Sequence, residues 1–424
     1  MLDAQFIRDN VTVVKKNMEK KGLKSALVDE FLASEKKWRE LKGSIDELRR
    51  ERNEVTSEIM RLKKEGKDAA KALNRAKELP EKIKNSENEL ELLRANVDAL
   101  QLQIPNMMHE SVPIGKDDSE NVEVAKFGKP AKVKFEIKNH AETIETNGWS
   151  DFDSAREVAG NGFYYLQGKL AVLNQALIRY AIDTMVKKGF MYVETPLMLR
   201  GDVIKKVTDL NDMQNQIYKI ENEDLYLIGT SEHSMIGRYI NKVIPEEKLP
   251  LKQTSYSMCF RREKGAHGID EKGVYRTHQF NKVEMVVICH PKDSMKIYKE
   301  LKAITIDLFK KMKVPIRELA ICSGDLGSLK HVQVDIEAWS PRRNAYFEIG
   351  SCSNLTDAQA RRLNIKVTDG KDKYYPHTLN NTAIATSRAM VAIVENFQQK
   401  DGSVLVPLVL QKYTGFKKIE PVLQ

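Results

Sequence analysis

The sequence has no long apolar run and very few cysteines. A membrane-spanning helix needs about 20 consecutive apolar residues, and no such run occurs among the 424 residues, so we expect no membrane partner. Residues 1–10 include Asp3, Arg8 and Asp9 without an apolar core, which is unlike a secretory signal peptide. The four cysteines form no CxxC pair, which argues against disulfides and against zinc. We therefore expect reduced thiols, no zinc and a cytoplasmic protein.

Acidic and basic residues are both frequent, and the basic residues are slightly in excess. Lysine and arginine total 69 against 60 acidic residues, giving a formal charge of +9. This excess is compatible with a polyanionic partner but does not demonstrate one. The length is sufficient for a large core and indicates two domains.

Glycine and proline are almost absent between residues 28 and 104. Two apolar seams with spacings of three and four flank a break at Glu65 and Gly66. The pattern predicts an antiparallel helical hairpin, a coiled coil, whose first helix would span roughly 50 Å. Pro80 should kink or interrupt the second helix. The positions of the two seams are Trp38, Leu41, Ile45, Leu48, Val55, Ile59 and Leu62, then Ala69, Ala72, Ala76, Leu79, Ile83, Leu90, Leu93, Val97, Leu100 and Ile104.

The break in this hairpin is basic. A lone coiled coil more often serves as a spacer or a dimerisation element, and a charge run is more often simply solvated. A basic tip on a long arm would, however, suit contact with a nucleic-acid backbone. The basic residues are Arg61, Lys63, Lys64, Lys67, Lys71, Arg75 and Lys77.

Beyond a linker predicted at residues 109–130, apolar strands alternate with amphipathic helices. Residues 169–190 read as a helix ended by Gly189, whereas "LYLIGT", "KVEMVVICH" and "NAYFEIGS" read as strands. No GxxxxGK[ST] or GxGxxG phosphate loop is present, so a nucleotide must be held differently. The predicted organisation is an N-terminal domain (1–108) with the long arm, the linker, and an α+β domain (131–424).

Three segments combine arginines and carboxylates with strand or helix patterns. They are "KKGFMYVETPLM", with a strand entered at Pro196, "FRRE" at 260–263, and "LNNTAIATSRAMVAIVENFQQKDGSVLVP". In this order they resemble motifs 1, 2 and 3 of the class II aminoacyl-tRNA synthetases. The segments "TSE", "HQFNKVE", "SCSNLTDAQARRL" and "HTLNNT", together with the arm, resemble the seryl-tRNA synthetases, nearest to archaeal members of the common, non-zinc type.

The resemblance implies an antiparallel sheet flanked by helices and a homodimer formed through motif 1. It implies ATP-dependent activation of L-serine to seryl-adenylate and transfer to the 3′ end of tRNA(Ser), with tRNA(Sec) as a further candidate. Activation brings together two anions, the α-phosphate of ATP and a carboxylate, which suits fixed guanidinium groups.

Residue roles follow from the same resemblance. Arg261 and Arg388 would be catalytic, Arg261 on the α-phosphate and the serine carboxylate and Arg388 on the distal phosphates. The ATP site would comprise Arg261, Arg262, Glu263 (adenine amino group), Arg276, Thr277, Phe280 (stacked on adenine), Glu348, Ile349, Gly350, Ser351 and Arg388. The L-serine site would comprise Thr230, Ser231, Glu232, Arg261, Glu284, Asn380 and Thr382. Glu348 and Ser351 would hold Mg²⁺ accompanying ATP. Arg61, Lys63, Lys64, Lys67, Lys71 and Arg75 would contact tRNA.

Several positions depart from the family pattern: Ser234 where proline is usual, Lys264 for alanine, Phe347 for arginine, Ala358 for tyrosine, and the segment 328–334. Two other functions stay open on sequence alone. One is a synthetase-like paralogue that loads a carrier other than tRNA, although such paralogues lack the arm. The other is a coiled-coil RNA-binding protein without catalysis, which leaves the arginine and carboxylate set unexplained.

Overall fold

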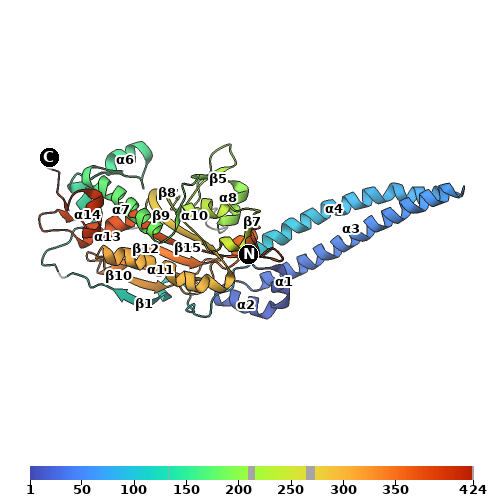
Figure 1. The fold of residues 1–424 in the computed structure, drawn as a ribbon, viewed down its shortest axis with the longest axis horizontal. Coiled ribbons are helices and arrows are strands. Elements are labelled where there is room, and N and C mark those ends of the chain that lie inside the picture. Colours follow the sequence, from blue (N-terminus) through green and yellow to red (C-terminus); the bar gives the residue numbers. More distant parts are fainter. Residues whose placement is uncertain (132, 209–214, 264–272, 423–424) are drawn as a thin grey trace. The chain divides into compact units, whose positions relative to one another are not determined.

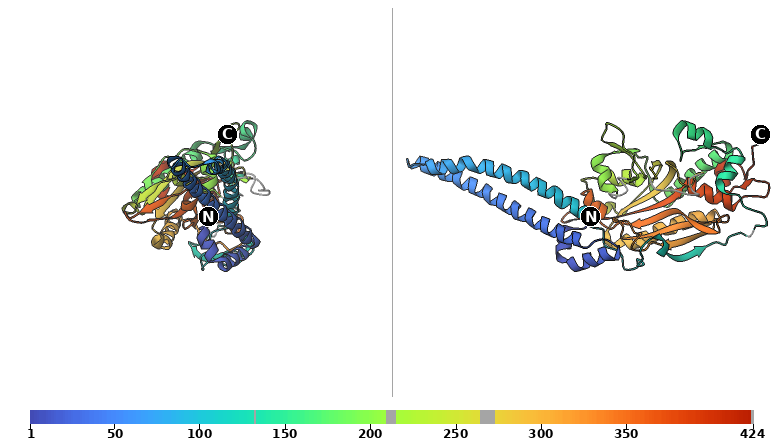
Figure 2. Two further views of the ribbon diagram at one scale, coloured as in Figure 1. Left: turned by 90° about the vertical axis from the view of Figure 1, so that its right-hand side faces the viewer. Right: turned by 180° about the vertical axis from the view of Figure 1, so that it is seen from behind.

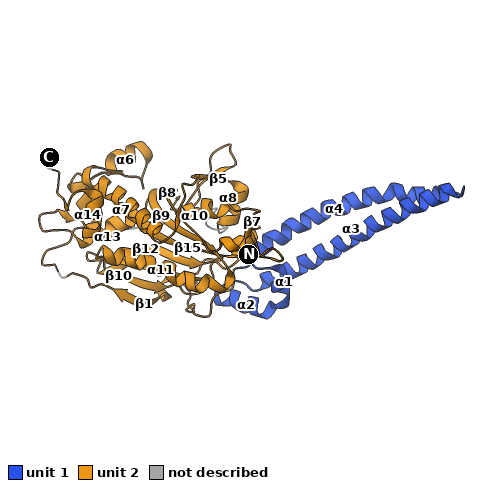
Figure 3. Ribbon diagram, viewed as in Figure 1, with its two compact units in different colours: residues 1–105 blue, residues 106–424 orange. Residues whose placement is uncertain are grey.

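The computed structural model describes residues 1–131, 133–208, 215–263 and 273–422. The chain divides into two compact units, residues 1–105 and residues 106–424 (Figure 3). Residues 106–130, most of which were predicted to be a linker, belong to the second unit, and β1 (Val122–Phe127) is the edge strand of its large sheet.

The first unit is helical. Its elements are α1 (Ala4–Asp9), α2 (Val11–Lys20), α3 (Ala26–Lys64) and α4 (Ala70–Gln103), and α3 and α4 run side by side as a long hairpin (Figures 1 and 2). The turn falls at the predicted break, where Gly66 adopts the left-handed conformation that glycine tolerates best. Val55 packs against Ala72 and Leu79, flanked by Leu48, Ile59, Leu62 and Ala76. The predicted coiled coil is confirmed.

Pro80 lies within α4, which continues as helix on both sides of it. The predicted alternative of a break is therefore wrong. Proline in a helix interior costs about 3 kcal/mol. Leu79 precedes Pro80 and Ile83 follows it, and both side chains are buried. This packing stabilises the helix at the point where Pro80 cannot donate a backbone hydrogen bond.

The second unit is built on an eight-stranded sheet with the order β1-β10-β11-β12-β15-β9-β8-β4. All neighbouring strands in it are antiparallel except β4 and β8, so the predicted α+β class is confirmed. The strands are β4 (Met191–Tyr192), β8 (Leu251–Phe260), β9 (Gln279–Cys289), β10 (Ile316–Ala320), β11 (Val332–Ser340), β12 (Ala345–Asn354) and β15 (His377–Ala385).

Helices cover both faces of this sheet. Odd-numbered residues of β9, from Val283 to Cys289, enter the main core with α7 (Gly168–Lys187), α11 (Ser294–Lys311) and α13 (Thr386–Asn396). Val286 and Ile288 enter a second cluster with α8 (Gly201–Val207), α10 (Ser231–Gly237) and α12 (Ala358–Arg362). Because strand residues alternate between faces, the even-numbered residues of β9 share the face that carries α8, α10 and α12.

Smaller elements complete the unit. They are η1 (Asp118–Glu120), α5 (His140–Thr146), β2 (Ser150–Asp151), α6 (Phe152–Ala159), β3 (Tyr165–Leu166), β5 (Met198–Arg200), β6 (Leu225–Leu227), β7 (Val243–Pro245), η2 (Glu246–Lys248), η4 (Pro291–Asp293), β13 (Lys366–Thr368), β14 (Lys373–Tyr374), β16 (Val404–Leu405), α14 (Leu408–Thr414) and β17 (Lys418–Ile419).

The helix predicted at residues 169–190 is confirmed as α7, and the three predicted strands as β6, β9 and β12. The strand predicted to start at Pro196 is wrong, because Pro196 lies between the short strands β4 and β5. Proline has no N–H for a strand ladder.

The four cysteines, Cys259, Cys289, Cys322 and Cys352, are buried free thiols, as predicted. Across the described part of the chain, no helix combines the length and apolarity needed to cross a bilayer.

Candidate active site

A cavity of about 850 Å³ opens on the face of the sheet that carries α8, α10 and α12. All but two of the residues predicted to bind ATP or serine line it. Ser231 does not: it is fully buried, and its hydroxyl donates to the Ser255 carbonyl at 3.4 Å. Arg262 is also absent from the lining, and its backbone N–H donates to the Gln216 carbonyl at 2.9 Å. The predicted residues that do line the cavity are Thr230, Glu232, Arg261, Glu263, Arg276, Thr277, Phe280, Glu284, Glu348, Ile349, Gly350, Ser351, Asn380, Thr382 and Arg388.

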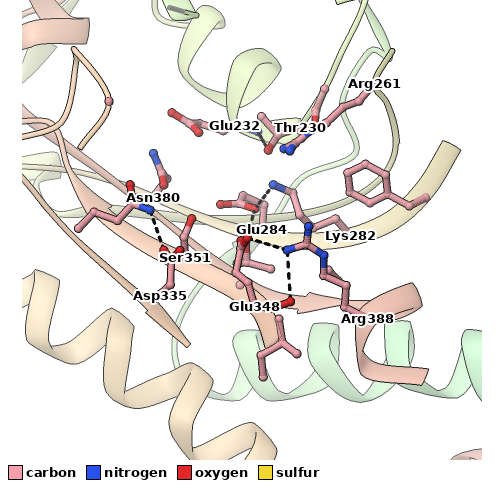
Figure 4. Close-up of a pocket in the computed structure, with 18 of the residues that line it drawn as sticks. Thr230, Glu232, Arg261, Lys282, Glu284, Asp335, Glu348, Ser351, Asn380 and Arg388 are labelled. Atoms are coloured by element: carbon pink, nitrogen blue, oxygen red, sulfur yellow. Dashed lines mark hydrogen bonds and ion pairs between the residues drawn. The ribbon is translucent and has the colours of Figure 1, made fainter. Parts of the chain in front are cut away.

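Strand β9 gives the cavity its central row. Phe280, Lys282 and Glu284 alternate along the strand and all face the cavity, as the two-residue strand period requires. Lys282 Nζ lies 2.7 Å from Glu284 Oε2, with both side chains buried (Figure 4). The sequence interpretation missed Lys282. Lys282 stands two residues before Glu284 in "HQFNKVE", and this strand spacing could have identified it.

Strand β15 supplies the neighbouring row. Thr378, Asn380 and Thr382 share one face of this strand, and Thr382 stands directly opposite Glu284 in the ladder. The Thr382 hydroxyl donates to Glu284 Oε2 at 3.4 Å. A Cβ on Gly350 would lie only 2.9 Å from the Thr382 Cβ. The close packing of Thr382 at this point therefore requires the glycine.

Glu232 faces this row from α10 (Figure 4). The Thr230 hydroxyl caps the helix by accepting from the Glu232 N–H at 3.3 Å. Burial raises the pKa of Glu232, and the negative charge of Glu284 adds to the rise. The next residue, His233, also lines the cavity, and burial lowers its pKa to about 3, so its imidazole is neutral at pH 7. The sequence interpretation missed His233.

A β-bulge in β12 shapes the opposite end of the cavity. The ladder with β11 pairs Gly350 with Ile336 and Glu348 with Glu337, which leaves Ile349 as the extra residue. Three-residue spacing would put Glu348 and Ser351 on opposite faces of a regular strand. Because of the bulge, both line the cavity, opposite the Glu337 and Asp335 positions of β11.

Glu348 is paired with Arg388 from α13. Arg388 Nη1 lies 2.9 Å from Glu348 Oε2 and also donates to the Glu348 carbonyl at 3.3 Å (Figure 4). Burial opposes the charge on both partners. Their mutual attraction nevertheless lowers the pKa of Glu348 and raises that of Arg388. The Arg388 guanidinium lies 5.1 Å from the ring centroid of Tyr275, so its orientation is fixed from two sides.

Arg261 lies at the end of β8 and brings a further guanidinium into the cavity, which Arg276, Arg317 and Arg343 also line. Its Nε donates to the Gly229 carbonyl at 3.2 Å, and its guanidinium lies 5.3 Å from the centroid of Phe280. Two residues later, Glu263 has a φ of 44°, a left-handed conformation uncommon for a side chain of this kind. Its N–H donates to Gln216 Oε1 at 3.1 Å, which secures the turn.

Several of the departures from the family pattern have a structural account. Phe347 is buried and packs edge-on against Tyr275 at 5.5 Å, so it supports the ring on which Arg388 rests. The Ser234 hydroxyl donates to the Pro196 carbonyl at 2.7 Å. Ala358 is fully buried against Leu329 and Leu355.

The segment 328–334 contributes a further charged group to the cavity. Lys330 donates to Gln333 Oε1 at 2.5 Å, and Gln333 donates to Asp335 at 2.6 Å. Burial and the charge of Glu348 raise the pKa of Asp335 to about 8. Lys264 lies outside the described residues.

In the first unit, the predicted tRNA-binding residues gather around the turn of the hairpin. All six, Arg61, Lys63, Lys64, Lys67, Lys71 and Arg75, are exposed. Lys67 is paired with Glu65 at 2.8 Å, and Arg75 forms an ion pair with Glu51 across the hairpin.

The antiparallel sheet and the cavity that holds Arg261 and Arg388 are typical of one class of enzyme. Residues 217–397 match the model of the class II tRNA synthetase core domain (G, H, P, S and T), so the protein is a class II aminoacyl-tRNA synthetase. Residues 1–108 match the seryl-tRNA synthetase N-terminal domain. The serine–tRNA ligase of Methanocella arvoryzae is 48% identical over 418 residues, which cover 97% of this chain and 98% of that protein. That of Pyrococcus horikoshii is 42% identical over 446 residues, covering 100% and 98%.

Solved structures agree. The crystal structure of seryl-tRNA synthetase from Pyrococcus horikoshii complexed with ATP superimposes with a TM-score of 0.94 at 41% identity and full coverage of both chains. The cytoplasmic enzyme from Naegleria fowleri in complex with AMP gives 0.89 at 30% identity, covering 100% of this chain and 99% of that one. The chain belongs to the seryl-tRNA synthetase family. Its activity is the ATP-dependent joining of L-serine to tRNA.

Proposed function

We propose that the cavity holds ATP and L-serine end to end, with Arg261 at their junction. Phe280 stacks on the adenine, Glu263 and the Thr277 backbone contact its edge, and Arg276 and Arg388 approach the phosphates. The observation that carries this proposal is the convergence of two fixed guanidinium groups, Arg261 and Arg388, on one cavity that Glu232 and Glu284 also line. Fixed donors stabilise charge that develops in a transition state without having to reorganise.

The serine end is acidic because a free amino acid presents an ammonium group and a hydroxyl. Glu232 takes the ammonium, while Glu284, Asn380 and Thr382 surround the hydroxyl. Lys282 balances the charge of Glu284 at 2.7 Å. Alanine is rejected because the buried polar groups built for a hydroxyl would be left unpaired. Threonine keeps the hydroxyl and is rejected by crowding of its extra methyl group.

Activation joins a carboxylate oxygen of serine to the α-phosphorus as the bond from that phosphorus to the bridging oxygen of pyrophosphate breaks. Arg261 draws the two anions together and keeps its contact with the α-phosphate as charge shifts. Arg388 neutralises the departing pyrophosphate. A terminal ribose hydroxyl of tRNA then attacks the acyl carbon, and AMP leaves with the electrons of the broken acyl–phosphate bond.

We infer magnesium as the companion of ATP at Glu348 and Ser351. Both offer oxygen, the donor that a hard cation prefers, and the bulge at Ile349 brings them to one face. Within the described ranges, no three His, Cys, Asp or Glu side chains gather as a metal site by themselves. The phosphates of ATP would therefore have to complete the coordination. A bound cation supplies charge neutralisation on the phosphates.

The first unit is assigned to tRNA and the second to catalysis. The exposed basic tip suits phosphate contacts along an RNA helix, and tRNA(Ser) is the expected substrate, with tRNA(Sec) a further candidate. A cytoplasmic location is supported by four free thiols, which suit a reducing compartment.

We also propose a homodimer through the motif 1 segment. This segment and α7 before it expose five apolar side chains that a partner could cover. They are Val172, Val186, Met191, Leu197 and Met198. Light scattering should give twice the chain mass of 48.5 kDa, and Met191→Lys with Met198→Lys should shift it toward the single-chain value. A single-chain mass for the unmodified protein would contradict the assignment.

The serine assignments are tested at Thr382 and Glu284. Thr382→Ala and Glu284→Gln should each raise the KM for serine by about tenfold or more, because each removes a polar contact inside a buried site. The KM for ATP should change by about twofold at most. Steady-state pyrophosphate exchange measures both constants. Equal losses for serine and ATP would indicate a general folding defect and would contradict the separate serine subsite.

A further inference from the structure

Among the residues that the structure describes, one neighbour gives the Glu232 carboxylate a side-chain hydrogen bond. Gln359 Nε2, from α12, donates to Glu232 Oε1 at 2.7 Å. The other groups that act on Glu232 are charges. Glu284 and Lys282 face it from β9, and Lys330 faces it from the segment before β11. Glu284 disfavours the ionised form of Glu232, whereas the two lysines and the Gln359 hydrogen bond favour it.

Gln359 is itself held in one orientation. The Thr378 hydroxyl donates to Gln359 Oε1 at 2.8 Å, and Gln359 Nε2 also approaches the Val207 carbonyl at 3.5 Å. An amide whose oxygen accepts from Thr378 must direct its NH₂ group toward Glu232. Gln359 and Thr378 are both almost fully buried, at 2% and 1% exposure. Neither the hydroxyl nor the amide therefore has water as a ready substitute partner.

Thr378 is linked to the serine site through Gln359. It shares a face of β15 with Asn380 and Thr382, but only the latter two line the cavity, which Gln359 also lines. The result is a chain of three side chains from three elements: a hydroxyl on β15, an amide on α12 and a carboxylate on α10.

We infer that Gln359, oriented by Thr378, is a positioning residue for amino-acid recognition that holds the Glu232 carboxylate in one orientation, aimed at the substrate ammonium. This rests on the proposed role of Glu232. A hydrogen bond from a buried amide to a carboxylate both fixes its rotamer and favours its charged form. Gln359 thereby sets how much serine affinity Glu232 can supply at a given pH.

The test compares Gln359→Met, which keeps the length of the side chain and removes its donor, with Thr378→Val and the double variant. Gln359→Met should raise the KM for serine about 10- to 100-fold, the range for losing a hydrogen bond to a charged group, with the KM for ATP within about twofold. Thr378→Val should raise it about threefold, and Thr378→Ser should restore it. The double variant should match Gln359→Met, because Thr378 acts through Gln359.

A pH profile separates positioning from packing. Burial and the charge of Glu284 raise the pKa of Glu232, and the Gln359 hydrogen bond opposes that rise. Its removal therefore leaves less carboxylate at a given pH. The acid limb of kcat/KM for serine should therefore move to higher pH in Gln359→Met. Gln398→Met is the matched control, since Gln398 is another buried glutamine, bonded to Thr143 and Lys138 and absent from the cavity lining. It should leave that limb and the serine KM in place.

The outcomes distinguish this inference from the proposed function. Glu232→Gln should raise the KM for serine in either case. If it does while Gln359→Met behaves as the unmodified enzyme, the positioning role is refuted and the Glu232 assignment stands. If Glu232→Gln leaves the KM unchanged, the assignment itself fails. Additive effects of Gln359→Met and Thr378→Val would refute the chain. If Gln359→Met does not fold, an unchanged KM for serine in Thr378→Val would refute it instead.

Discussion

Replacing Arg261 or Arg388 should abolish adenylate formation. In Arg261→Ala and Arg388→Ala, we expect serine-dependent pyrophosphate exchange to fall by about 10³-fold or more, because each variant loses fixed charge that acts while the phosphate transfers. Arg388→Lys should recover little, since an ammonium keeps the charge but not the two-point geometry. Exchange kinetics measure the loss, and circular dichroism checks that each variant is folded.

Arg343 provides the matched control. Its guanidinium lies 5.2 Å from the centroid of Tyr275, the same ring that Arg388 contacts at 5.1 Å. Arg343→Ala therefore removes a similar cation from a similar aromatic contact and should cost less than about tenfold. Near-normal exchange in a folded Arg261→Ala or Arg388→Ala enzyme would overturn the proposed roles. A loss of equal size in Arg343→Ala would mean that Arg261 and Arg388 contribute only a general positive charge.

Shortening the hairpin should separate the two half-reactions. Arg49 and Glu87 join α3 and α4 at 2.7 Å, so residues 50–86 can be replaced there by a short glycine-rich turn. Pyrophosphate exchange should stay within about twofold, because the ATP and serine residues all lie in the second unit. Aminoacylation of tRNA(Ser) should fall by about 10²-fold or more. Normal charging of tRNA(Ser) by the shortened enzyme would show that the hairpin is only a spacer and would contradict its role in tRNA binding.

The basic tip can be tested without shortening the chain. Changing Lys63, Lys64, Lys67 and Lys71 to glutamine should weaken tRNA binding and flatten its salt dependence, because fewer counterions are released. The same number of changes at Lys296, Lys299, Lys310 and Lys311, exposed lysines of α11, controls for net charge. Equal slopes in both variants would contradict a tip-specific contact.

The sequence predicts the hairpin well because its determinants are local. Heptad spacing, scarce glycine and Gly66 at the turn act over a few residues. Pro80 was misjudged because its cost is local, whereas the packing of Leu79 against Val55 that offsets it joins two helices. At Pro196 the predicted strand conflicts with the local rule that proline cannot pair in a strand.

The residues of the site also divide into those that local sequence patterns predict and those that they do not. The alternation of Phe280, Lys282 and Glu284 on one face of β9 could be read from strand periodicity, although only two of the three were given roles. Glu348 and Ser351 share one face of β12 because of a bulge. The residue spacing in "FEIGS" does not predict that bulge. The contact of Gln359 with Glu232 joins residues 127 positions apart. A single sequence carries no signal for such a pair.

The most direct test of the central claim is amino-acid-dependent exchange of pyrophosphate into ATP by the intact chain. The assigned activity predicts exchange that requires L-serine and saturates with it, with alanine and threonine at least about 10²-fold poorer in kcat/KM. Exchange that is absent, or that proceeds equally with alanine or threonine, would contradict the assignment of this cavity to serine activation.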